Sequence, residues 1–132
     1  MINILIIDDD NDDSDFLRDA IQQVSPRTNC TMVSSSDEAL KGLQTKQIPR
    51  PDLIFLDLNM PRINGMQCLG KLKATAGVSE IPVVIYTTSK SHDQNVESLK
   101  LGASHFITKP SGYRHLCQIV RDVFAKELIH SD

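Results

Sequence analysis

The chain has 132 residues, of which 40% are hydrophobic and 23% are charged, and its formal net charge at pH 7 is −3. This length suits one domain with a full hydrophobic core and leaves no room for a second, so we expect a single domain over residues 1–132. The slight excess of acid and the scattered basic residues argue against binding to nucleic acid or to an anionic membrane surface.

Apolar runs of strand length alternate with segments of helical periodicity along the chain. In chain order we predict a strand at 4–7, a helix around 16–24, a strand at 30–33, a helix around 39–43, a strand at 53–56, a helix around 66–72, a strand at 81–86, a helix around 96–99, a strand at 105–108 and a last helix around 113–124. The runs at 4–7, 53–56 and 81–86 are apolar on consecutive residues, which is typical of strands buried on both faces.

Polar and glycine residues mark several expected helix ends. Ser35 and Glu38 have the spacing of a capping box, and Ser111 stands just before the last helix. Gly102 follows the fourth helix, as a C-terminal glycine does. Five strand–helix repeats with short connections predict a parallel sheet with helices on both faces.

In such a sheet, function gathers at the carboxyl ends of the strands. Three carboxylates, those of Asp8, Asp9 and Asp57, follow two of the predicted strands and would repel one another unless a cation or a proton offset their charge. Mg²⁺ is the natural partner of such a group, and Mn²⁺ is a substitute. Lys109 adds a further positive charge, and Thr87 can donate a hydrogen bond. The set predicts a site in which Asp57 accepts a phosphoryl group.

Other readings of the acidic N-terminal segment are weaker. Asp12, Asp13 and Asp15 are expected to be solvated residues of a first helical turn, where negative charge is favourable. A calcium loop is excluded because Asp13 stands where its glycine is needed and Asp19 where its glutamate is needed. The chain has no glycine-rich nucleotide-binding motif.

Taken together, the motifs "ILIIDDD", "DLIFLDLNMPRINGM", "IPVVIYTTS" and "LGASHFITKP" resemble the receiver domain of response regulators, the phosphoacceptor module of two-component signalling. The resemblance covers essentially the whole chain. It implies a flavodoxin-like fold, an α/β fold with a five-stranded parallel sheet in the order 2-1-3-4-5. It also implies a role for each strand-end residue: phosphorylation on Asp57, Mg²⁺ binding by Asp8, Asp9, Asp57 and the backbone carbonyl of Asn59, and phosphoryl contacts from Thr87 and Lys109.

Further expectations follow from the same resemblance. Phe106 occupies the position of the switch aromatic, although it lacks the hydroxyl of the tyrosine that is frequent there; the alternative is an ordinary aromatic with one rotamer. The family more often has alanine or glycine at the position of Thr88. The larger side chain of Thr88, together with Ser89 beside the pocket, is therefore expected to narrow the access of water or of a phosphatase to the phosphoryl group. The Lys109–Pro110 peptide bond is expected to be cis.

Three functions are compatible with an aspartate of this kind. The first is a phosphorylation switch that takes its phosphoryl group from a sensor histidine kinase or a phosphotransfer protein and hydrolyses it slowly. The second is an aspartyl-phosphate phosphatase, which needs an acid where this chain has Asn59. The third is a degenerate receiver that only binds proteins, which would need the loss of Asp57, Lys109 or the acidic pair.

The first function carries expectations about partners and location. No output domain is expected after the last helix, so the output is another protein. We expect it, or a phosphorylation-dependent homodimer, on the face formed by the fourth helix, the fifth strand and the last helix, at about 92–101, 104–108 and 112–127. Cys30, Cys68 and Cys117 have no disulfide or metal spacing, which favours reduced thiols in the cytoplasm.

Overall fold

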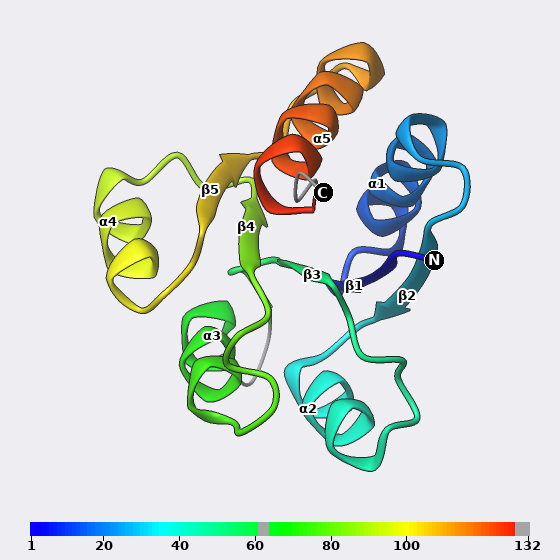
Figure 1. Cartoon of the computed structure of the whole chain (residues 1–132). Helices are drawn as coiled ribbons and strands as arrows, with labels where there is room; N and C mark the ends of the chain where they lie inside the picture. Colours follow the sequence, from blue (N-terminus) through cyan, green and yellow to red (C-terminus); the bar gives the residue numbers. More distant parts are fainter. Residues whose placement is uncertain (61–63, 129–132) are drawn as a thin grey trace.

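In the computed structural model, which describes residues 1–60 and 64–128, strands and helices alternate along the chain (Figure 1). The strands are β1 (Asn3–Ile7), β2 (Asn29–Val33), β3 (Leu53–Leu56), β4 (Val83–Thr87) and β5 (His105–Thr108). The helices are α1 (Asn11–Val24), α2 (Ser36–Thr45), α3 (Gly65–Ala74), α4 (His92–Lys100) and α5 (Tyr113–Glu127). All strand pairs are parallel and the order is β2-β1-β3-β4-β5, so the predicted fold class is confirmed.

Helices cover both faces of this sheet. Figure 1 shows α1 and α5 together on one side, α2 and α3 on the other, and α4 beside β5. Side chains alternate along each strand, so Ile4 and Ile6 pack in the cluster that contains α1 and α5, whereas Leu5 and Ile7 pack in the cluster that contains α3. These four side chains are almost fully buried, and such burial stabilises the fold by about 1.5–3 kcal/mol for each. The prediction of strands buried on both faces is therefore confirmed.

Strand register brings the functional strand ends to one edge. Ile7 pairs with Leu56, so Asp8 and Asp57 follow their strands at the same level, and Asp57 N donates to Ile7 O at 2.9 Å. Thr87 pairs with Thr108 on the neighbouring strand, which places Lys109 one residue beyond it. The carboxyl ends of β1, β3, β4 and β5 therefore surround one small region.

The positions of two helix ends agree with the sequence and that of a third differs. The Ser35–Glu38 capping box is only half formed, because Glu38 Oε1 accepts from Ser34 N at 3.2 Å rather than from Ser35 N. Ser35 caps α2 by accepting a hydrogen bond from Glu38 N at 3.1 Å, and Gly102 follows α4 with a φ of +108°, which suits glycine. The prediction that Ser111 precedes the last helix as its cap is wrong. Gly112 is the N-cap of α5 and provides no side-chain bond, because the helix begins one residue later than that cap would require.

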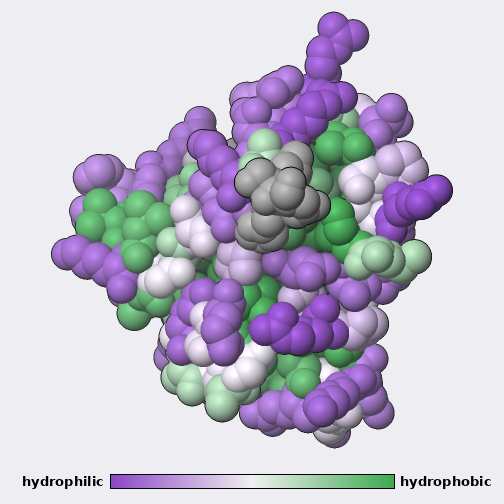
Figure 2. Space-filling view, in the orientation of Figure 1, coloured by the Kyte–Doolittle hydropathy of each residue, from purple (hydrophilic) through white to green (hydrophobic). Residues whose placement is uncertain are grey.

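The surface is polar over most of the view in Figure 2, with an apolar patch over α4. That patch includes Val96, Leu99 and Leu101, whose exposed fractions are 37%, 45% and 40%. Within residues 1–60 and 64–128, no helix is long and apolar enough to cross a membrane.

Candidate phosphoacceptor site

Three carboxylates converge at the carboxyl edge of the sheet, as the sequence predicts. Asp8 and Asp9 follow β1 and Asp57 follows β3, and one oxygen from each lies within 4.8 Å of the others. Asp8 and Asp57 are buried, with exposed fractions of 2% and 5%, whereas Asp9 is exposed. The cluster is thus closed on the protein side and open on the side of Asp9. Such a cluster can bind a hard divalent cation that keeps some of its water ligands on the open side.

Asp8 is held in place through both of its oxygens. Oδ1 accepts a hydrogen bond from Asp10 N at 2.9 Å, and Oδ2 accepts one from Lys109 Nζ at 2.8 Å. Burial raises the pKa of Asp8 to about 6, although the hydrogen bonds from Lys109 and from the backbone of Asp10 act in the opposite direction. The folded chain therefore carries a carboxylate whose charge is not fully offset by its neighbours.

Lys109 contacts more carboxylates than the sequence predicts. Its ammonium lies 2.8 Å from Asp8 Oδ2, 2.8 Å from Asp13 Oδ2 and 3.9 Å from Asp57 Oδ2, and it stands 5.4 Å from the centroid of the Tyr86 ring. Burial alone lowers the pKa of this lysine, but the hydrogen bonds to Asp13 and Asp8 outweigh it, so the pKa is raised above its ordinary value. Lys109 is a fixed cation at the site.

The expectation that Asp13 is only a solvated residue is therefore wrong. Asp13 belongs to the first turn of α1, where its own N–H donates to Asp10 Oδ1 at 3.1 Å. The turn directs its carboxylate toward Lys109, while 37% of the side chain remains exposed. Nothing in the local sequence distinguishes it from Asp12 and Asp15, since the contact joins residues 96 positions apart.

Asn59 reaches the site through its side chain as well as its backbone. Its N–H donates to Asp57 Oδ1 at 3.3 Å, while Nδ2 donates to Thr87 Oγ1 at 3.2 Å and to Thr88 Oγ1 at 3.3 Å. Thr87 is fully buried, and its hydroxyl also accepts from Ser89 N at 3.3 Å. Because the Thr87 oxygen accepts twice, its O–H proton is the group available to donate to a further oxygen. Thr88 is exposed and Ser89 half-buried beside the pocket, where access was expected to narrow.

Phe106 lies near Thr87 but not directly beside it. Phe106 pairs with Ile85 on β4, two residues before Thr87, so the two side chains share one face of the sheet on a diagonal. The ring is half-buried against the cluster that includes α3. Its role as a switch stays a prediction.

Gly65 supports the site in a way that sequence reasoning missed. This first residue of α3 donates its N–H to Leu58 O at 3.0 Å, and a Cβ at this position would overlap the Asp57 carbonyl oxygen and the Leu58 Cα. Only glycine lets α3 begin this close to the backbone that carries Asp57. The Asn64–Gln67 capping box, which the sequence "NGMQ" contains, fixes the same helix end.

The prediction of a cis Lys109–Pro110 bond is wrong, since no cis peptide bond occurs in residues 1–60 and 64–128. The lysine reaches Asp8 and Asp13 with a trans bond, the form that X–Pro bonds prefer by about 0.5–1 kcal/mol. Residues 61–63 of the predicted motif after Asp57 lie outside the described residues.

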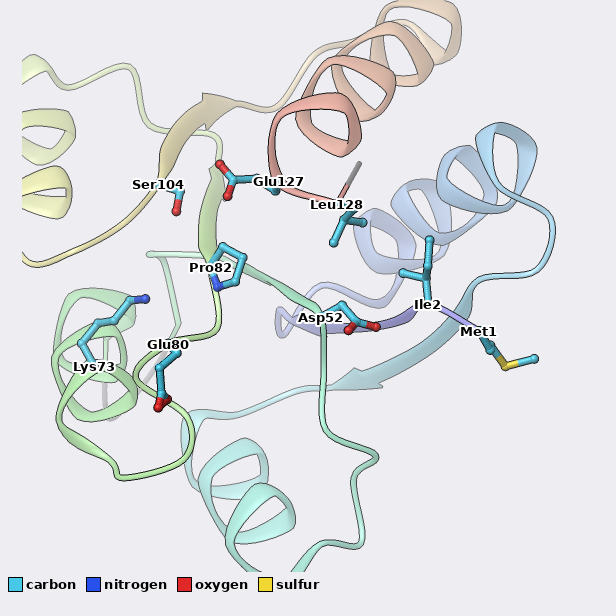
Figure 3. A pocket seen from close by; sticks show the side chains of 9 residues that line it. All are labelled: Met1, Ile2, Asp52, Lys73, Glu80, Pro82, Ser104, Glu127 and Leu128. Carbon is cyan, nitrogen blue, oxygen red and sulfur yellow. The ribbon is translucent and has the colours of Figure 1, made fainter. Parts of the chain in front are cut away.

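A cavity of about 570 Å³ lies at the opposite edge of the sheet, where the strands begin (Figure 3). Its lining mixes charges of both signs, with Asp52, Lys73 and Glu127 among the residues labelled there. Lys73 is already bonded to the carbonyls of Ser79 and Ile81, at 3.1 and 2.8 Å. This cavity shares no residue with the carboxylate cluster.

The chain is similar to known response regulators in sequence. The model of the response regulator receiver domain matches residues 4–121. Response regulator Rcp1 of Synechocystis sp. is 28% identical over 91% of this chain and 84% of its own length. The nitrate/nitrite response regulator protein NarL of Escherichia coli is 30% identical over 92% of this chain, which spans 56% of NarL.

Solved structures agree with the sequence match. The Mn²⁺-bound form of Rcp1 has a TM-score of 0.85 and 26% identity, with 98% of each chain covered. The phosphorylated cyanobacterial phytochrome response regulator RcpA has a TM-score of 0.86 and 29% identity, covering 96% of this chain and 94% of its own. The family model agrees with the strand order and with the acidic cluster at the carboxyl edge of the sheet. The chain therefore belongs to the response regulator receiver domains of two-component signalling.

Proposed function

We propose that this chain is a phosphorylation-activated signalling switch that accepts a phosphoryl group on Asp57. The donor is a phosphohistidine on a sensor histidine kinase or on a phosphotransfer protein. In the transfer, the bond between phosphorus and the histidine nitrogen breaks, a bond between phosphorus and a carboxylate oxygen of Asp57 forms, and the imidazole leaves. Slow hydrolysis by water restores the carboxylate and releases inorganic phosphate, so the role is regulatory.

The observation that carries this proposal is the difference between Asp57 and its neighbours. Both oxygens of Asp8 are engaged by Asp10 N and Lys109, and Asp9 is exposed beyond the strand end. Asp57 follows a fully buried strand and has Oδ1 held by Asn59 N, while Oδ2 lies 3.9 Å from the nearest lysine nitrogen, beyond hydrogen-bond length. Asp57 is therefore fixed in direction and has one oxygen available as a nucleophile.

The residues present also fit a divalent cation. Receiver domains bind Mg²⁺ or Mn²⁺ at an acidic pocket, and Asp8, Asp9 and Asp57 provide the hard oxygen atoms that these ions prefer. We assign these carboxylates and the Asn59 carbonyl as ligands of Mg²⁺, with Mn²⁺ as a substitute. When bound, the ion offsets the negative charge of the phosphoryl group and of the carboxylate that attacks it.

Two side chains would hold the transferred group. Lys109 provides a fixed positive charge beside Asp57, and the Thr87 hydroxyl has its proton free to donate to a phosphoryl oxygen. Thr88 and Ser89 lie at the entrance, where they would limit access of water or of a phosphatase. These roles are supported by position and chemistry together.

The phosphorylated state would be read on the face formed by α4, β5 and α5. Movement of Thr87 toward the phosphoryl group would leave room for the Phe106 ring, which shares its face of the sheet. A downstream protein, or a second phosphorylated copy of the chain, would bind there. The free cysteines Cys30, Cys68 and Cys117 favour the cytoplasm as the place of this exchange.

The test is labelling with a small phosphodonor. The parent chain, incubated with acetyl phosphate, should gain one phosphoryl group that is acid-stable and base-labile, and it should do so with Mg²⁺ but not with EDTA. Asp57→Asn should abolish the label, whereas Asp12→Asn, which removes an exposed carboxylate from the neighbouring helix turn, should retain it. Undiminished labelling of Asp57→Asn would overturn the proposal.

A further inference from the structure

The ammonium of Lys109 is shared between three carboxylates, of which only that of Asp57 would be phosphorylated. Two of its contacts, to Asp8 and Asp13, are 2.8 Å long, and the third, to Asp57, is 3.9 Å. The lysine side chain is 8% exposed, and among the residues that the structure describes its ammonium lies against these three carboxylates and the Tyr86 ring. A lysine ammonium has three donor protons, of which Asp8 and Asp13 engage two.

Asp13 differs from the other carboxylates because a cation at the acidic cluster would not neutralise it. The oxygens that converge within 4.8 Å belong to Asp8, Asp9 and Asp57. A divalent ion and Lys109 together balance those three charges, and Asp13 then leaves one negative charge in excess. The backbone of Asp13 is also held in place, because its N–H donates to the side chain of Asp10, the N-cap of α1.

From this arrangement we propose that Asp13 is a regulatory counter-ion that competes with the phosphoryl group for Lys109 and lowers the affinity of the site for that group. The proposal rests on the proposed phosphorylation of Asp57. Phosphorylation takes the charge at Asp57 from one minus to about two minus, so the demand for the lysine rises at the moment when Asp13 already uses one of its donors. The phosphoryl group would be held less tightly and returned or passed on more readily.

The proposal predicts that the Asp13 carboxylate specifically weakens the binding of a phosphoryl analogue at Asp57. Beryllofluoride is a suitable probe, because its beryllium accepts an electron pair from a carboxylate oxygen and its fluorines occupy the places of phosphoryl oxygens. With Mg²⁺ saturating, we expect Asp13→Asn to bind beryllofluoride about five- to tenfold more tightly than the parent. The effect stays moderate because Asp13 is partly exposed and water screens its charge.

Asp12→Asn is the matched control, since it removes the same charge from the same helical turn at an exposed position. It should change the dissociation constant for beryllofluoride less than twofold. Asp13→Asn should also leave the affinity for Mg²⁺ within about twofold, because Asp13 lies outside the converging cluster.

Each outcome has one meaning. Unchanged or weaker beryllofluoride binding by Asp13→Asn would overturn the competition, and so would an equal gain in Asp12→Asn, which would reveal a general charge effect. A large loss of Mg²⁺ affinity in Asp13→Asn would make it a metal ligand and overturn the proposal. If the parent itself binds no beryllofluoride, the phosphoacceptor function fails, and the counter-ion role falls with it. Thermal unfolding of each variant confirms that the fold is intact.

Discussion

Asp8 gives the protein a pH dependence that follows from its burial. Burial raises its pKa to about 6 against the opposing bonds from Lys109 and Asp10 N. The folded chain thus holds this proton more tightly than the unfolded chain does. The contribution of Asp8 to folding is fully present below its unfolded pKa of 3.8 and is lost as the pH rises through about 6.

The size of the effect follows from the two pKa values. The difference between 3.8 and about 6 corresponds to about 3 kcal/mol of unfolding free energy in the absence of a metal. Asp8→Asn cannot titrate at this position. We therefore expect the unfolding free energy of the parent to fall by about 2.5 kcal/mol relative to that of Asp8→Asn between about pH 4 and pH 7.5, because the remainder of the difference is already lost below pH 4.

Mg²⁺ should reverse this loss, because it binds the ionised carboxylate in competition with the proton. We expect the stabilisation of the parent by Mg²⁺ to be small at about pH 5 and to reach its full value above about pH 7. In Asp8→Asn the same addition should have a much smaller effect at every pH.

The assay is urea-induced unfolding followed by circular dichroism, in EDTA and in Mg²⁺, over this pH range. Asp12→Asn serves as the control and should behave as the parent does, because its side chain is exposed. If the difference between the parent and Asp8→Asn stays flat across the range, or if Mg²⁺ stabilises the parent equally at both ends of it, the reasoning about Asp8 is refuted.

Three further predictions concern the surroundings of Asp57. Asp9→Ala should weaken Mg²⁺ binding at least about tenfold in a calorimetric titration, and Asp12→Ala less than about twofold, because Asp9 belongs to the carboxylate cluster and Asp12 does not. Equal effects would show that the pocket is misplaced. Gly65→Ala should lower the unfolding free energy by about 1–3 kcal/mol through overlap with backbone, whereas Gly70→Ala in the same helix should raise it by about 0.5–1 kcal/mol, and equal urea midpoints would contradict this. Thr87→Ala should still be phosphorylated, but its NMR shift changes should not extend over α4 and β5; a spread like that of the parent would reject the switch.

The fold was predictable because its strongest signals are local. Strands buried on both faces need consecutive apolar residues, and β1, β3 and β4 have them. Once the strands are parallel, the residues that follow them must meet at one edge, so Asp8, Asp57 and Lys109 could be placed together from the sequence.

What could not be predicted depends on contacts between distant segments. Asp13 has the sequence context of any acid in a first helical turn, and its bond to Lys109 exists only after the folded sheet brings the end of β5 to the same edge as the start of α1. Gly65 has a role only because α3 begins against the backbone of Asp57 and Leu58. The start of α5 at Tyr113 and the trans Lys109–Pro110 bond likewise depend on how the chain turns after β5.

The position of the phosphoryl group is the most direct test of the central claim. After phosphorylation with acetyl phosphate and Mg²⁺, borohydride reduces an aspartyl phosphate to homoserine, which peptide mass spectrometry locates in the chain. We predict homoserine in place of Asp57 and an unmodified carboxylate at Asp8, Asp9 and Asp13. Homoserine at any of those three positions, or at none, would contradict the assignment of Asp57 as the phosphoacceptor.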